Sequence, residues 1–262
     1  MKKTACLVCF VLIIVACASS PTGRKQLILM SSTQMAQMGA TAFSQMKTKS
    51  PPNKDPGVNA YVQCVSKALL KAAGQNPSQW EVRVFNDKSA NAFALPGKKI
   101  GVHTGMIALA QTPSQLAAVI GHEIGHVEAN HGSERVSMGM TAQMAQQLTS
   151  QLLEGSNLQG PTLAAIGLGA QFGVLLPYSR THESEADYIG LQTMAKAGFD
   201  PQEAVTLWQL MAQKNQGRSA PEFLSTHPSP QTRIKQLSKH VRDGAAHLYQ
   251  RSVKNKTCKK QI

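Results

Sequence analysis

The residues His122-Glu123-Ile124-Gly125-His126 decide how this chain is interpreted. Residues four apart on a helix lie on one face about one turn apart, so the two imidazoles can converge on a single ion. Glu123 is rotated about 100° from His122, where its carboxylate reaches a water held by the ion rather than the ion itself. The pattern therefore predicts a site for one Zn²⁺ per chain, with His122 and His126 as ligands and Glu123 as the general base.

Three residues upstream predict that this motif lies on a helix. Thr112 is a good N-cap, Pro113 suits the first helical position, and Gln115 can bond back to the cap. We expect the helix to run to about His131 and to stop at Gly132, a residue typical of helix ends.

A catalytic zinc ion needs a third protein ligand and one open position. The histidines outside the motif are His103, His131, His182, His227, His240 and His247. His131 is expected on the far side of the motif helix, as a structural residue near the helix end. Position 132 is Gly, which excludes the metzincin class, whose third histidine lies six residues after the motif.

The better third ligand is Glu183, in the stretch Glu183-Ser184-Glu185-Ala186-Asp187. Glu183 and Asp187 lie four apart on one face of a second helix. Glu183 can bind the metal while Asp187 accepts the free ring N–H of a ligating histidine. Glu185 is expected to face solvent. The alternative is that all three acids only favour the N-terminal turns of a helix.

The first residues are typical of an export signal. Met1-Lys2-Lys3 precedes an apolar run, 7–15, that is too short to anchor the chain as a span. Residues 14–17, Ile-Val-Ala-Cys, resemble the bacterial lipobox, so we expect removal of 1–16 and a lipid on Cys17. Ala18 and Ser19 are similar to an outer-membrane sorting signal, whereas an ordinary cleaved signal is the alternative.

Two cysteines remain after this processing. Cys6 and Cys9 leave with the signal and Cys17 takes the lipid, so Cys64 and Cys258 are an even pair in an oxidising compartment. A disulfide between them would tie the C-terminal tail to the first helix of the domain.

The chain is basic, with 27 Lys and Arg against 14 Asp and Glu and a formal charge of +13. Such a charge suggests nucleic acid, an anionic membrane surface or acidic substrates as partners. Export argues against nucleic acid. Residues 233–260 hold nine basic side chains and one acid, and so supply +8 of the total. The alternative for this stretch is a solvated, charged helix.

The remaining patterns predict a helix-dominated α+β fold with a small antiparallel sheet. We expect strands at 80–85, 92–95 and 100–103, the last two forming a hairpin. Helices are expected over 31–46, from 58 to about 73, and from 181, 201 and 230 onwards. The apolar run 163–176 is short for a membrane span and is expected to be buried or interfacial. We divide the chain into the signal 1–16, a tether and helix 17–57, a catalytic domain 58–250 and a basic tail 251–262.

These motifs resemble peptidase family M48, and among its members the soluble bacterial lipoproteins. The matching pieces are residues 91–94 (Asn-Ala-Phe-Ala), 122–126, 183–187, His227-Pro228 and Arg233-Ile234, and the resemblance covers about residues 24–240. It implies a zincin-like domain in which His122, His126 and Glu183 bind zinc and Glu123 is the base. The chain lacks the run of transmembrane helices of some members, so intramembrane cleavage is not implied.

The resemblance carries two further expectations. Residues 100–103 resemble the family's edge strand, on which a substrate would lie as an added strand. His227 has three possible roles. It can donate a hydrogen bond to the oxyanion, fill the open position of the zinc in a resting enzyme, or hold two loops together.

The resulting functional hypothesis is a zinc endopeptidase, lipid-anchored on the periplasmic side of the envelope and sorted to the outer membrane. Its substrates would be misfolded or misassembled envelope proteins. The alternative is a metal-bearing assembly factor or chaperone for outer-membrane proteins, in which proteolysis is rare or gated. A structural lipoprotein with a vestigial site is less consistent with a sequence that keeps the ligands, the base and the supporting acid.

Overall fold

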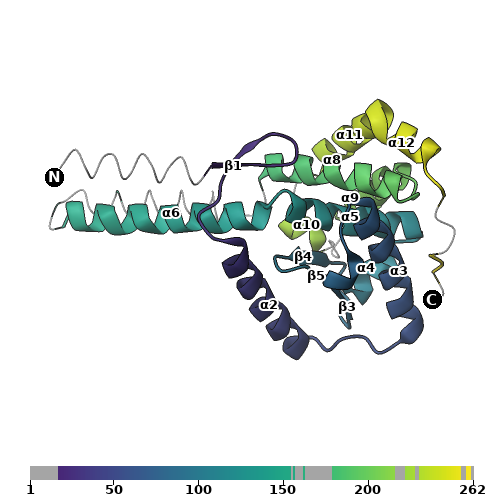
Figure 1. Cartoon of the computed structure of the whole chain (residues 1–262), viewed down its shortest axis with the longest axis horizontal. Coiled ribbons are helices and arrows are strands. Elements are labelled where there is room, and N and C mark those ends of the chain that lie inside the picture. The colour runs from purple at the N-terminus through teal and green to yellow at the C-terminus, as the bar shows by residue number, and fades with distance from the viewer. Residues whose placement is uncertain are drawn as a thin grey trace.

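The computed structural model describes residues 17–154, 156, 162, 179–215, 222–227, 230–254 and 258–260. The predicted signal, 1–16, and the apolar run 163–176 lie outside the described residues. Figure 1 shows a helical body around a small sheet, with one helix projecting from it. This arrangement confirms the helix-dominated α+β class with a small sheet.

The elements follow the order of the chain. The strands are β1 (Cys17–Ser19), β2 (Lys25–Leu27), β3 (Glu81–Phe85), β4 (Ala92–Leu95) and β5 (Lys99–His103). The helices are α2 (Ser32–Lys49), α3 (Pro56–Ala72), α4 (Thr104–Leu109), α5 (Pro113–Glu128), α6 (His131–Leu152), α8 (Arg180–Lys196), α9 (Gln202–Asn215), α10 (Phe223–Thr226), α11 (Pro230–His240) and α12 (Ala246–Arg251). A π-helical turn, Val241–Ala245, joins the last two.

The central sheet has the strand order β3-β5-β4 and is mixed. The hairpin β4–β5 is antiparallel as expected, but β3 runs parallel to β5. The expectation that residues 100–103 form the edge strand is therefore wrong, because β5 is inserted between the other two strands. The edge beside the predicted site is β4. Its N–H at Ala94 points away from β5, towards Glu123.

The motif helix ends earlier than predicted. α5 stops at Glu128, and Asn130 takes a left-handed conformation with φ 53°. Asn tolerates this region better than most residues other than Gly, so the chain turns there and α6 begins at His131. The predicted stop at Gly132 is wrong for this reason.

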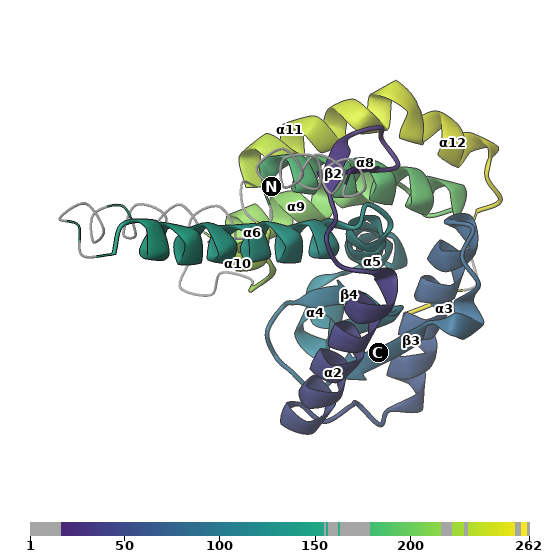
Figure 2. The same cartoon turned by 60° about the vertical axis from the view of Figure 1, so that its left-hand side comes forward.

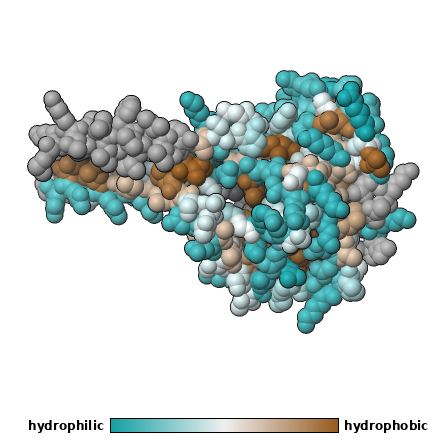
Figure 3. Space-filling view, in the orientation of Figure 1, coloured by the Kyte–Doolittle hydropathy of each residue, from teal (hydrophilic) through white to brown (hydrophobic). Residues whose placement is uncertain are grey.

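α6 projects from the body, and Figure 3 shows hydrophobic residues along it above a hydrophilic lower side. Its exposed apolar side chains are Met138, Met140, Met144, Leu148 and Leu152. Among the described helices, none combines the length and the apolar character that a membrane crossing requires.

Two helices cross at close range and bring the predicted ligands together. Gly125 of α5 lies so near α8 that an added Cβ would stand 2.8 Å from the carbonyl oxygen of Ala186. At Gly190 of α8, a Cβ would meet the backbone nitrogen of His122 at 2.8 Å. Only glycine allows this approach, which places the short Glu183 side chain within reach of the α5 histidines.

The structure joins Cys64 of α3 to Cys258 in a disulfide with a Cα–Cα distance of 5.5 Å. Both residues belong to or pack against the main hydrophobic core, so the bond fixes the C-terminal segment on the domain. A cross-link across 194 residues restricts the unfolded chain strongly, and such bonds typically stabilise a fold by about 2–5 kcal/mol.

Candidate metal centre

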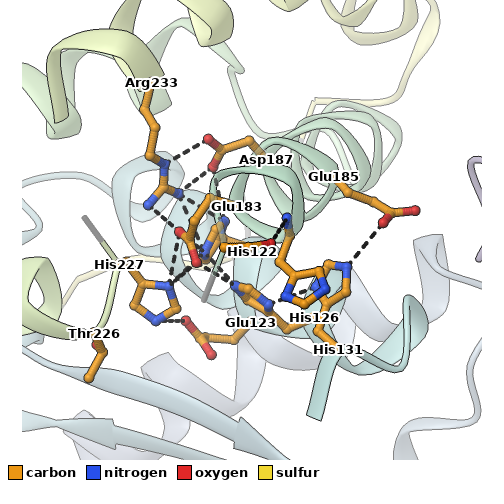
Figure 4. Close-up of polar contacts among 12 residues, drawn as sticks. His122, Glu123, His126, His131, Glu183, Glu185, Asp187, Thr226, His227 and Arg233 are labelled. Carbon is orange, nitrogen blue, oxygen red and sulfur yellow. Dashed lines mark hydrogen bonds and ion pairs between the residues drawn. The ribbon is translucent and has the colours of Figure 1, made fainter. Parts of the chain in front are cut away.

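Four buried side chains from three segments converge on one point (Figure 4). His122 and His126 come from α5, Glu183 from the first turn of α8, and His227 from the residue after α10. One donor atom from each lies within 4.8 Å of all the others. The Nε2 atoms of His122 and His126 are 3.0 Å apart, and His227 Nδ1 is 3.2 Å from the former. Glu183 Oε1 is 3.0 Å from His227 Nδ1 and 3.5 Å from His126 Nε2.

These separations fit a tetrahedral zinc site. Zinc binds imidazole nitrogen and carboxylate oxygen at about 2.0–2.2 Å, so neighbouring ligand atoms of a tetrahedron stand about 3.3–3.6 Å apart. The cluster offers three nitrogens and a carboxylate at close to this spacing. Burial alone would raise the pKa of the Glu183 carboxyl. Its contacts with His122, His126 and His227 outweigh burial and lower that pKa far below the usual range, so the carboxylate stays ionised.

Glu123 lies beside the cluster but contributes no donor atom to it. Its Oε2 accepts a hydrogen bond from the Ala94 N–H at 3.1 Å, while Oε1 stands 3.4 Å from His227 Nε2. No hydrogen-bond donor within the described part of the chain reaches Oε1, although it is fully buried. Burial raises the pKa of this carboxyl, the direction a general base working near neutral pH requires.

His122 is supported from behind by an acid and an arginine. Sequence reasoning placed Asp187 beside a ligating histidine, and its Oδ1 lies 2.9 Å from His122 Nδ1. Arg233 of α11 donates to Asp187 at 2.5 and 2.8 Å and to Glu183 at 2.6 Å. Its guanidinium also lies over the ring of Trp208, 3.6 Å from the centroid. The arginine therefore fixes both carboxylates that face the histidine.

Arg233 belongs to one of the pieces that resemble the family, but the sequence assigns it no role at the site. It is counted there among the nine basic residues of 233–260, whereas it is one of the most deeply buried side chains, with 2% exposure. The sequence contains a signal for the burial of Arg233, because Arg233, Leu237 and Val241 recur at intervals of four and so share one helix face. All three are buried in the structure. An arginine on an apolar helix face needs a buried acidic partner.

His126 is supported by a second set of residues. Its Nδ1 lies 2.9 Å from His131 Nδ1, and His131 Nε2 lies 3.1 Å from Glu185 Oε2. The expectation that Glu185 faces solvent is wrong: it is buried and bonds Arg24 at 3.0 Å. Nothing in the sequence near Arg24 indicated this contact, which spans 161 residues. His131 lies at the start of α6, close to the end of the motif helix as expected, but it contacts a predicted ligand.

His227 is held in place by a short helix. Its backbone N–H bonds the Phe223 carbonyl at 2.9 Å, and the two rings stack with centroids 4.3 Å apart. The Phe223 N–H in turn bonds the carbonyl of Ala90, just before β4. α10 thus fixes the residue that follows it, and the imidazole of that residue enters the donor cluster.

A comparison with protein families identifies the family to which this chain belongs. The model described as "Peptidase family M48" matches residues 56–241, which include α5, α8 and the whole of α11. The chain belongs to peptidase family M48. The members of this family are metallopeptidases that bind a metal, typically zinc, so membership supports a metalloprotease acting on protein substrates.

Relatives occur in mitochondria and in bacteria. The chain is 38% identical to the mitochondrial metalloendopeptidase OMA1 of Schizosaccharomyces pombe over 68% of its own length and 51% of the relative. It is 33% identical to the OMA1 of Arabidopsis thaliana, over 82% and 43%. It is 30% identical to the beta-barrel assembly-enhancing protease of Escherichia coli, over 77% and 42%. The chain therefore spans about half the length of the relatives it matches.

Proposed function

We propose that this M48 chain is a zinc-dependent endopeptidase of the bacterial cell envelope that cleaves misfolded or misassembled proteins. The observation that carries the proposal is the buried cluster of four donor atoms beside a carboxylate that is not one of them. His122, His126 and Glu183 would hold the ion. This division between ligands and a neighbouring base is the arrangement that metal-assisted peptide hydrolysis needs.

When bound, zinc supplies Lewis-acid chemistry, lowering the pKa of a coordinated water towards about 7 and polarising the scissile carbonyl. Glu123 takes the proton of the attacking water on Oε1, the oxygen that faces the cluster, while the Ala94 N–H holds Oε2. The same carboxyl then gives a proton to the leaving amine. Arg233 and Asp187 keep His122 in one tautomer throughout.

The substrate path follows from the edge strand and a neighbouring cleft. Within the described residues no strand pairs with the outer edge of β4, so an extended peptide can add there, next to Glu123. A cleft of about 730 Å³ is lined by residues of α2, the β4–β5 turn and the α5–α6 corner. Met35, Met38 and Val136 are among its lining residues, and so is His126 of the donor cluster. Unfolded chains supply the extended, apolar segments that suit such a groove.

A second candidate function is supported by His227 and by one group of relatives. The His227 imidazole lies in the position of a fourth ligand, which would leave no place for water in this conformation. The bacterial relatives are named beta-barrel assembly-enhancing proteases. We therefore retain a metal-bearing assembly factor or chaperone for outer-membrane proteins, with gated proteolysis, as the alternative.

The proposal is tested by metal analysis and cleavage of an unfolded protein. Purified protein is expected to hold about one zinc per chain. Removal of zinc with a chelator should abolish cleavage of unfolded casein, and added zinc should restore it. Protein that cleaves casein equally well after its metal has been removed would contradict a zinc-dependent mechanism.

The proposed location rests on the sequence of the N-terminus. Residues 14–17 resemble a lipobox, so a lipid on Cys17 would anchor the chain on the periplasmic side, at the outer membrane. Cys17→Ser is expected to release the protein from membranes into the soluble periplasmic fraction. Fractionation after a high-salt wash measures this, with Cys64→Ser as a control that keeps the lipid. A Cys17→Ser variant that stays membrane-bound would show that another segment anchors the chain.

A further inference from the structure

Each histidine of the motif has a carboxylate and an arginine behind it, but the two arginines come from opposite ends of the chain. Arg233, near the C-terminus, supports His122 through Asp187. On the other side, His126 is linked through His131 and Glu185 to an arginine of the N-terminal segment. This second series of contacts, from Arg24 through Glu185 and His131 to His126, has no role in the chemistry proposed above.

The hydrogen positions of the second series follow from its geometry. Because Nε2 of His126 is one of the four donor atoms, it must be free of a proton, and the neutral ring carries its proton on Nδ1. This N–H donates a hydrogen bond to His131 Nδ1 at 2.9 Å. His131 must then carry its own proton on Nε2, which donates to Glu185 Oε2 at 3.1 Å. Glu185 therefore selects the tautomer of His131, and His131 selects that of His126.

Glu185 is itself fixed by the hairpin β1–β2, which lies against α8 and the start of α6 (Figure 2). Arg24 Nε donates to Glu185 Oε2 at 3.0 Å, and the Thr22 hydroxyl donates to Oε1. The same arginine forms a two-pronged contact with Glu134 at 2.7 Å for each nitrogen. Gln26 donates to the Ala129 carbonyl at 2.5 Å, at the corner between α5 and α6.

We propose that this N-terminal hairpin is part of the metal centre and that Arg24 is a positioning residue for zinc. Arg24 fixes Glu185, and Glu185 fixes His131. His131 then holds His126 in the orientation that binds the metal. The inference rests on the proposed zinc function. It also means that the segment carrying Cys17, seven residues before Arg24, is coupled directly to the site.

The chain contains a matched control for this proposal. Glu134 bonds the same arginine as Glu185 and also bonds a histidine, His182, at 3.1 Å. The rings of His182 and His131 stack with centroids 4.3 Å apart. His182 is not one of the four donor residues, however, so Glu134 contacts the series that ends at His126 only at Arg24.

The experiment measures zinc affinity by competition with a chelator in the full chain. Glu185→Gln is expected to weaken zinc binding about 10–100-fold, the usual effect of losing a residue that orients a ligand. Glu134→Gln should weaken zinc binding less than Glu185→Gln does, because Glu134 acts on His126 only through Arg24. Thermal melting of the metal-free proteins should show that both variants fold. Arg24→Gln should weaken binding in the same direction as Glu185→Gln, and Arg24→Lys should restore part of the loss.

The double variant Arg24→Gln/Glu185→Gln tests whether the two residues act in one series. Its zinc affinity should equal that of Glu185→Gln alone, because the arginine acts through that carboxylate. Equal weakening by Glu185→Gln and Glu134→Gln would overturn the proposal, as would additive losses in the double variant. Wild-type protein that binds no zinc would instead refute the proposed function itself.

Discussion

Replacing Glu123 with Gln is expected to lower kcat on an unfolded protein by about 10²–10⁴-fold while leaving the zinc content unchanged. The amide keeps the size of the side chain and can still accept the Ala94 N–H, but it cannot take a proton from water. Since Glu123 supplies none of the four donor atoms, the metal should stay bound. Initial rates on unfolded casein and metal analysis of the same sample measure both effects.

Two further variants show whether a loss of kcat in Glu123→Gln is due to the loss of the general base. Glu128 lies on the same helix and burial also raises its pKa, yet it is outside the donor cluster. Glu128→Gln should therefore retain wild-type kcat and zinc. Glu183→Ala should differ from Glu123→Gln by losing the metal itself, and its activity with the metal. Full zinc retention in Glu183→Ala would contradict the ligand assignment, and wild-type turnover in Glu123→Gln would contradict the assignment of the base.

In cells, the Glu123→Gln variant distinguishes the proposed protease function from the alternative function as an assembly factor. An inactive protease that still binds its substrates should accumulate them, so proteins recovered with Glu123→Gln but not with wild type would identify the targets. If the chain acts mainly as a chaperone, Glu123→Gln should support outer-membrane protein assembly as well as the wild type does. A loss of assembly that matches the loss of cleavage would exclude that alternative.

The parts of the site that sequence reasoning located are those whose geometry is local. His122 and His126, and likewise Glu183 and Asp187, lie four apart on one helix, so a regular backbone alone places each pair on one face. Caps set the helix starts, and Thr112 begins α5 as predicted. For α8 the cap is Ser179 rather than the expected Thr181. A helix start shifted by two residues changes no side-chain spacing within the helix.

The parts that were missed depend on contacts between distant segments. Whether Glu185 faces solvent or protein is decided by the N-terminal hairpin, 161 residues away, and no spacing rule within α8 contains that information. The same holds for the order of the sheet, because the insertion of β5 beside β3 depends on a crossover rather than on the hairpin pattern. Periodicity shows which residues share a face, and only tertiary packing shows what covers that face.

His227 is the residue for which the sequence left three roles open, and its contacts now favour one of them. A residue that only joins two loops has no reason to place a ring nitrogen 3.0 Å from Glu183 Oε1 and 3.2 Å from His122 Nε2. An oxyanion donor should stand beside the metal and point at the substrate. In this conformation Nδ1 instead lies among the ligand atoms themselves, as a plug would. Phe223 of α10 holds His227 in this position, so α10 would have to move for such a plug to leave the cluster.

His227→Ala is therefore expected to raise basal cleavage of unfolded casein by about tenfold or more, since a contact that favours the closed state by about 1.4 kcal/mol reduces the open fraction tenfold. Thr226→Ala, at the exposed neighbouring position, is the control and should leave the rate unchanged. If His227 instead serves only the oxyanion, its removal should lower kcat about 10²-fold or more. A rise in initial rate at unchanged zinc content supports the plug and a fall supports the donor. If His227→Ala cleaves casein at the same rate as Thr226→Ala, the imidazole has no influence on the reaction. His227 would then have only a structural role.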